Sequence, residues 1–249
     1  MKSLLVLCLL AALPVLAEDP QVTALISQAD AEERLHHTRA ALELLLKAEQ
    51  VEPQNVGVLL RISKQYSDLV NSAKPATAAE QVGRKSLDYA RRAVQLDPQN
   101  AKAHLSVAVG YGKLTDLVGN KVKVEYTKYI KEETEKAIAL DATDDYAWHV
   151  MGRWHFGVAN VGPVLKALAL VAYGGLPPAS NEEAAKCLKK ATEIAPQRII
   201  HHATLARVYR TMGKYELAAK EWQAVASLPA TDKEDEAEKR AAQQALASK

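Results

Sequence analysis

The stretch Arg92-Ala93-Val94-Gln95-Leu96-Asp97-Pro98 decides the fold, because closely similar stretches occur three more times in the chain. They are KAEQVEP at 47–53, KAIALDA at 136–142 and KATEIAP at 190–196. Each has a basic residue, then Ala, then an apolar residue near the end, and three of the four finish with Pro. Proline cannot continue a helix but can begin the next turn. Each stretch is therefore predicted to end a helix, and we call these four stretches the terminators.

The residues that follow each terminator also repeat. Ten residues after it comes a small residue, at Ser63, Ala108, Gly152 and Ala206. Thirteen residues after it comes a ring, at Tyr66, Tyr111, His155 and Tyr209. A larger residue stands six after it, at Leu59, His104, Trp148 and His202. These offsets place the residues on one stripe of a helix, where a partner helix can approach closely.

This pattern resembles the tetratricopeptide repeat, which has a large residue, a small one, a Tyr and a final Pro at similar spacings. We therefore expect an all-α, tetratricopeptide-repeat-like α-solenoid of about four helix pairs. The terminators lie 45, 44 and 54 residues apart, whereas the usual repeat has about 34. Each interval should therefore carry an insertion between its two helices, at 74–77, 119–121 and 159–180.

Composition agrees with a helical, globular chain. The 249 residues are 48% hydrophobic and 25% charged, with only 11 Gly and 10 Pro. Such a composition is typical of folded proteins rather than disordered ones. The formal net charge of +2 provides no overall field for nucleic acid, so we expect no nucleic-acid partner.

The first 17 residues have the pattern of a secretory signal peptide. Lys2 precedes the apolar run from Leu4 to Leu13, Pro14 breaks that run, and small residues before Glu18 fit a cleavage site after Ala17. We therefore expect an exported protein, in a periplasm or secreted; the alternative is an N-terminal membrane anchor. The expected domains are the signal peptide (1–17), a lead-in helix (18–39), the repeat domain (40–230) and a charged capping helix or tail (231–249).

Five further stretches of sequence point to a particular family of helical repeat proteins. They are YIKE at 129–132, EKAIAL at 135–140, WHVMGRW at 148–154, GLPP at 175–178 and EEA at 182–184. Together they resemble the regulator of microtubule dynamics family, over about residues 40 to 245. The resemblance implies a helical repeat domain that is linked to phospholipid binding. It also implies members associated with microtubules, mitochondria or contacts between organelle membranes. A microtubule partner is implied by this resemblance alone.

The candidate binding residues face the expected concave groove. The position eleven residues after each terminator holds Lys64, Val109, Arg153 and Arg207, and Arg210 occupies the next groove-facing offset of the last repeat. Guanidinium groups offer paired donors that suit carboxylates and phosphates. These residues predict a pocket for an acidic peptide end or a phosphate headgroup. The alternative is that they are solvated and paired with nearby acidic residues.

The insertion at 161–176 is the most apolar stretch of the chain after the first 17 residues. It is too short to cross a bilayer, and it is interpreted either as an extra packed helix or as a flap over an acyl chain. In the second interpretation Leu168 and Tyr173, with Trp148 and Trp154, contact a phospholipid or fatty acyl ligand. The alternatives are a scaffold that binds a partner's helix or C-terminus, and a membrane-anchored microtubule-associated protein.

No motif predicts catalysis, a metal site or a cofactor. The seven histidines lack the spacing of zinc ligands. Cys187 is the single cysteine outside the first 17 residues, and no partner spacing of a nucleophile accompanies it. We therefore expect a non-enzymatic binding module.

Overall fold

The computed structural model describes residues 19–247, and every regular element in this range is a helix. The expected signal peptide lies outside the described residues. The first helices of the successive pairs are α1 (Pro20–Arg34), α3 (Val56–Val70), α5 (Ala101–Leu114), α7 (Asp145–Ala159) and α10 (Ile199–Thr211). The second helices are α2 (Thr38–Val51), α4 (Ala76–Leu96), α6 (Asn120–Leu140), α9 (Asn181–Ile194) and α11 (Tyr215–Ser227). The remaining two are α8 (Pro163–Tyr173) and α12 (Lys233–Ala247).

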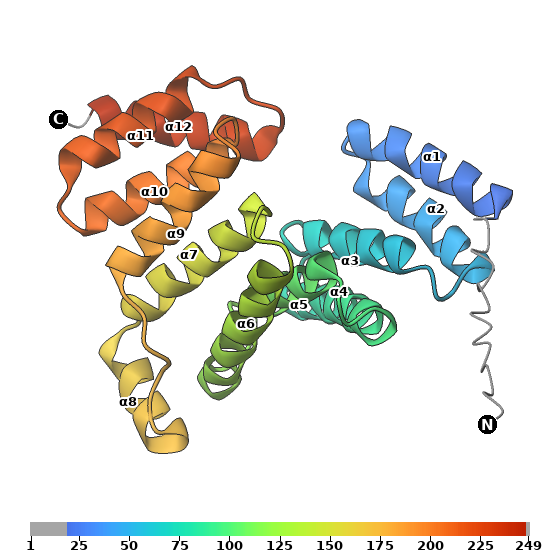
Figure 1. The fold of residues 1–249 in the computed structure, drawn as a ribbon, viewed down its shortest axis with the longest axis horizontal. Helices are drawn as coiled ribbons and strands as arrows, with labels where there is room; N and C mark the ends of the chain where they lie inside the picture. Colours follow the sequence, from blue (N-terminus) through green and yellow to red (C-terminus); the bar gives the residue numbers. More distant parts are fainter. Residues whose placement is uncertain (1–18, 248–249) are drawn as a thin grey trace, which may run out of the picture.

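The helices form the expected solenoid, with each pair stacked on the next (Figure 1). The number of pairs is five rather than about four, because the lead-in helix α1 packs along α2 as a full partner. Each terminator ends a second helix: α2, α4, α6 and α9 stop two residues before the Pro or Ala that closes the stretch. Helix α12 packs on α10 and α11 and covers the last pair.

The three expected insertions take two forms. In the second and third pairs they lengthen the second helix, so that α4 and α6 have 21 residues each against 14 in α2 and α9. In the fourth pair the insertion forms a separate helix, α8, between α7 and α9. Gly174 and Gly175 end α8 with φ of 72° and 118°, a left-handed backbone that favours glycine.

Small residues allow the helices of a pair to approach, as their spacing predicts. Ser63 and Ser86 are buried between α3 and α4, where each hydroxyl donates to the other's backbone carbonyl at 2.8 Å. A Cβ on Gly152 would lie 2.6 Å from Leu188 Cγ. The small position is therefore a close contact between backbones in both pairs.

The large residue six positions after a terminator joins the helix to the terminator itself. In three repeats a ring nitrogen lies at hydrogen-bond distance from the last carbonyl of the terminator. The pairs are His104 Nε2 with Pro98 O at 2.9 Å, Trp148 Nε1 with Ala142 O at 2.9 Å, and His202 Nε2 with Pro196 O at 3.0 Å. Histidine and tryptophan are thus interchangeable here because both supply a ring N–H donor.

Candidate functional site

The first helices form the inner layer of the solenoid. Successive first helices contact one another, α3 with α5, α5 with α7 and α7 with α10, and α12 continues this row by contacting α10. Successive second helices make no comparable contact within residues 19–247. The row of first helices therefore follows the shorter, concave side of the curve.

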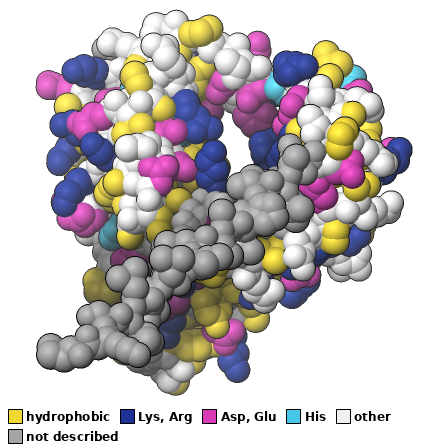
Figure 2. All heavy atoms as spheres, turned by 45° about the vertical axis from the view of Figure 1, so that its right-hand side comes forward, with side chains coloured by type: hydrophobic (Ala, Val, Ile, Leu, Met, Phe, Trp, Pro, Cys, Tyr) yellow, Lys and Arg dark blue, Asp and Glu magenta, His cyan; other side chains and the backbone are white. Residues whose placement is uncertain are grey.

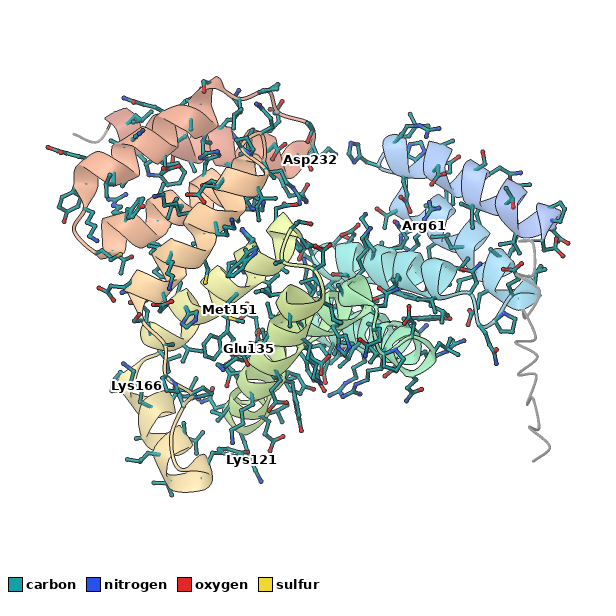
Figure 3. The ribbon with its side chains drawn as sticks, in the orientation of Figure 1. Arg61, Lys121, Glu135, Met151, Lys166 and Asp232 are labelled. Atoms are coloured by element: carbon teal, nitrogen blue, oxygen red, sulfur yellow. The ribbon has the colours of Figure 1, made fainter. Side chains whose placement is uncertain are left out.

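The concave side faces an opening between the N-terminal pair and the C-terminal helices. Figure 2 shows Lys and Arg side chains on both sides of this opening, with Asp and Glu side chains beside them. Figure 3 places Arg61 of α3 and Asp232, which precedes α12, on opposite sides of it. Arg61 is held by the α1 carboxylates of Asp30, at 2.6 Å, and Glu33, at 3.1 Å. It therefore ties α3 to α1 rather than offering a free charge.

A cluster of charged residues from four helices lies on the concave side. It consists of Lys64 and Asp68 of α3, Lys113 of α5, Arg153 of α7 and Glu234 of α12. Lys64 and Asp68 form an exposed ion pair, with Nζ and Oδ2 2.8 Å apart. We call these five residues the concave cluster.

Lys113 is the cation of the concave cluster that sequence reasoning missed. Burial lowers the pKa of its amine, and the neighbouring charge of Arg153 lowers it further, while the carboxylates of the cluster oppose this. Its Nζ donates to Asn71 Oδ1 at 3.2 Å. Lys113 stands one helical turn after Val109, the groove-facing position of its repeat, so the same helical period would have found it.

Lys113 and Arg153 are the unmatched charges of the concave cluster. In the described part of the chain, no carboxylate lies within 4.0 Å of either cation. Asp68 and Glu234 act on Lys113 only at longer range, so neither cation has a direct ion-pair partner among the described residues. The arrangement therefore has the electrostatic character of a site for a carboxylate or phosphate group.

The two arginines of the last repeat lie in different surroundings. Arg207 makes a paired contact with Glu238 of α12, at 3.2 Å and 2.5 Å, and its guanidinium centre lies 5.3 Å from the Trp222 ring centroid. It therefore ties the capping helix to α10. Arg210 is exposed, and the described residues supply it with no ion-pair partner.

The predicted apolar members do not join the concave cluster. Trp154 is 5% exposed and its indole donates to Thr127 O at 2.7 Å, within the core between α6 and α7. Trp148 is half-buried against the same core. Leu168 and Tyr173 lie on α8, which contacts α6 at the edge of the solenoid (Figure 1). The eight predicted site residues thus lie in several parts of the molecule, Trp154 in the core, rather than at one site.

The only histidines that meet in the described core join α7 to α10. His149 Nδ1 lies 3.0 Å from His201 Nδ1, and His201 Nε2 lies 2.7 Å from Asp145 Oδ2. Burial lowers the pKa of both imidazoles. Within residues 19–247, no group of three or more His, Cys, Asp or Glu residues has an arrangement that could hold a metal ion.

Cys187 is buried beside the core of α6 and α7. Burial raises the pKa of its thiol to about 11. Because only the thiolate is an effective nucleophile, this side chain acts as a packed apolar group at neutral pH.

No single helix in residues 19–247 is long and apolar enough to cross a bilayer. Helices α7 and α8 meet the requirement only in combination, and they are bent by 97° at their junction.

The sequence matches one protein family along nearly its whole described length. Residues 25–249 match the family described as "Regulator of microtubule dynamics protein 1-3". The chain belongs to this family. The resemblance inferred from the stretches between 129 and 184 is therefore confirmed.

Curated relatives carry the family's name. The regulator of microtubule dynamics protein 3 of Xenopus laevis is 27% identical over 227 residues, which is 87% of this chain and 48% of the relative. Protein 1 of Mus musculus is 28% identical over 201 residues, 80% of this chain and 65% of the relative. This member of the family thus spans about half to two thirds of the length of these relatives.

Solved structures confirm the fold. A thermophilic TPR protein of Thermus thermophilus superposes with a TM-score of 0.67 at 15% identity, covering 90% of this chain and 99% of that one. A MamA fragment from Desulfovibrio magneticus gives 0.50 at 13% identity, covering 83% and 94%. The tetratricopeptide-repeat-like α-solenoid is therefore established.

The family membership corrects the expected location. The apolar N-terminus led to the prediction of an exported protein, periplasmic or secreted, cleaved after Ala17. The relatives are named as regulators of microtubule dynamics, and microtubules are polymers of the cytosol. The prediction of export is therefore wrong.

Proposed function

We propose that this regulator of microtubule dynamics family member is a non-enzymatic protein-binding module whose concave cluster binds an acidic segment of a partner. The pairing of Lys113 with Arg153 supports the proposal: two neighbouring cations on adjacent inner helices with no carboxylate within 4.0 Å of either in the described chain. A partner carboxylate would supply the direct ion pair that both cations lack, and the fork of Arg153 would give it direction.

The surroundings of the concave cluster favour a protein segment over the phospholipid or acyl ligand expected from the sequence. An acyl chain needs an enclosed apolar cavity, and ligand pockets usually measure about 300–1,000 Å³. The recess beside the insertion is apolar apart from Lys166, but its volume of about 280 Å³ is below this range. The insertion stands at the edge of the solenoid, whereas the cations that would hold a headgroup lie on the inner helices.

The names of the relatives make microtubules the first partner to test. Full-length chain would be sedimented with stabilised microtubules, alongside a variant that carries Lys113→Gln and Arg153→Gln. The matched control carries Lys186→Gln and Lys189→Gln, which remove two exposed charges from the outer helix α9. The proposal predicts that the concave variant loses about tenfold or more in affinity, the loss expected from two charge-assisted contacts, while the control binds as the native chain does.

A short fluorescent oligoglutamate peptide tests the site independently of which protein is the partner. If the native chain binds this peptide through Lys113 and Arg153 but does not sediment with microtubules, the site stands and the partner is a different acidic protein. Equal losses in the concave and outer variants would show that binding follows total charge, which would refute the proposed site.

A further inference from the structure

The capping helix α12 brings its acidic start to the opening of the concave side. Its first turn contains Glu234, Asp235 and Glu236, and Figure 3 shows Asp232, which directly precedes the helix, beside the opening. Helix α12 packs on α10, the last of the inner helices. A negatively charged segment of the chain itself therefore stands beside the cations of the concave side.

Two carboxylates of α12 are directed at these cations. Glu238 accepts from both terminal nitrogens of Arg207, at 3.2 Å and 2.5 Å, and Arg207 occupies the groove-facing position of the last repeat. Glu234 stands four residues earlier, on the same face of the helix. Its charge acts on Lys113 of α5. We call Glu234 and Glu238 the acidic face of α12.

The docking of α12 does not depend on this acidic face. Ala242 is fully buried in a core cluster with Ile199 and Trp222, and the amine of Lys239 donates to Leu228 O at 2.5 Å. The Arg207 side chain is 42% exposed, and ion pairs with an exposed partner contribute little to stability. The main effect of the acidic face is therefore on the charge of the concave side.

We propose that the acidic face of α12 is an internal competitor of the acidic partner at the concave side. This inference rests on the proposed function of the concave cluster. Glu238 engages Arg207 through two parallel contacts, as a carboxylate of a partner would. Glu234 lowers the positive potential around Lys113.

The competition determines which segments bind well. A partner that reaches α10 has to displace Glu238 from Arg207, and its charge at Lys113 has to outweigh that of Glu234. A single carboxylate gains little against these two residues, because each of its contacts replaces one that already exists. A segment with several closely spaced carboxylates also reaches Arg153, which has no ion-pair partner within 4.0 Å in residues 19–247. The acidic face thus selects for dense negative charge.

Binding of the fluorescent oligoglutamate peptide tests the proposal. Its affinity would be measured for full-length native chain, for Glu234→Gln, for Glu238→Gln and for the variant with both changes. The matched control is Glu236→Gln, which makes the same change of charge on the same helix. Glu236 is 3.6 Å from Arg240, and both side chains are 64% exposed, so this pair faces solvent rather than the inner helices.

We expect each single variant of the acidic face to bind the peptide about threefold to fivefold more tightly, the gain expected from releasing one partly exposed ion pair or repulsion. The double variant should gain about tenfold or more, and Glu236→Gln should bind as the native chain does. Added salt should narrow the difference, because it screens exposed charges. Within residues 19–247 Glu234 forms no ion pair, so Glu234→Gln tests the proposal even where Glu238→Gln loosens α12 in melting curves.

The outcomes separate this proposal from the function on which it rests. If native chain and double variant bind the peptide equally well, the concave cluster stands and the competition is refuted. An equal gain in Glu236→Gln would also refute it, since binding would then follow total charge. Binding by the double variant alone would support the competition in its strongest form. Failure of all the chains to bind would remove the proposed function and this inference with it.

Discussion

Gly152 lies at a close contact between α7 and α9. A Cβ at this position would be 2.6 Å from Leu188 Cγ and 3.1 Å from the backbone oxygen of Ala184. Gly152→Ala should therefore push the two helices apart and lower the free energy of unfolding by about 1–3 kcal/mol. Urea unfolding followed by circular dichroism measures this change.

Gly157 provides the control on the same helix. An added Cβ there meets nothing within 4 Å, so Gly157→Ala should raise stability by up to about 1 kcal/mol through better helix propensity. If the two substitutions have the same sign, close helix contact is not the reason for the small residue at 152.

His202 faces an acceptor with each ring nitrogen. Nδ1 lies 2.6 Å from Glu221 Oε2, and Nε2 lies 3.0 Å from Pro196 O. Only the protonated ring can donate at both positions, and the hydrogen bond to Glu221 raises the pKa of His202 above its ordinary value of 6.5. A histidine whose pKa is raised by folding stabilises the folded protein. The stabilisation is complete at pH values below the pKa in the unfolded state, and it is lost as the pH rises through the pKa in the folded state.

Glu221→Gln should therefore cost most stability near about pH 6 and progressively less toward about pH 8. The quantity to compare is the difference in unfolding free energy between native chain and variant. The pKa values of the buried His149 and His201 are lowered, so these residues make the protein less stable as the pH falls below the pKa of an unfolded histidine. This contribution is the same in native chain and variant, and the difference removes it. A difference that stays constant or grows with pH would contradict a charged His202.

At the scale of helices, the sequence predicted most of the architecture because the terminators have a direct physical meaning. A Pro two residues past a helix end and a small residue at a fixed offset set where helices stop and where they touch. The pairing of α1 with α2 was not predicted, because α1 has no ring residue and no terminator stands before it to set the offsets. Its pairing depends on tertiary packing of Val22 and Ala29.

The insertion at 161–176 shows where the pattern of apolar residues is ambiguous. The sequence predicted either a packed extra helix or a flap over a ligand. The structure has an extra helix, but one that buries Ala169 and leaves Val164 and Val171 in solvent. Apolar composition indicates that a face needs a partner; it does not indicate whether the partner is the same chain.

At the scale of the whole molecule, the sequence predicted that several cations would stand on the inner helices, but not which charged residues they would meet. Lys64 and Arg153 are on the concave side, as expected, because the helical period fixes that face. The engagement of Arg207 by Glu238 could not be predicted, since it depends on how α12 folds back on α10. The importance of Lys113 depends on its neighbours from three other helices, which only the superhelical curve brings together.

Amide hydrogen exchange of the full-length chain, with and without saturating acidic partner, tests the central claim most directly. The partner is stabilised microtubules or, failing these, the oligoglutamate peptide. The concave cluster predicts slower exchange in the C-terminal half of α5 and in α7 around Arg153, with α9 unchanged and the effect absent when Lys113 and Arg153 are both Gln. Protection confined to α9 or to the outer faces of α4 and α6 would contradict the account.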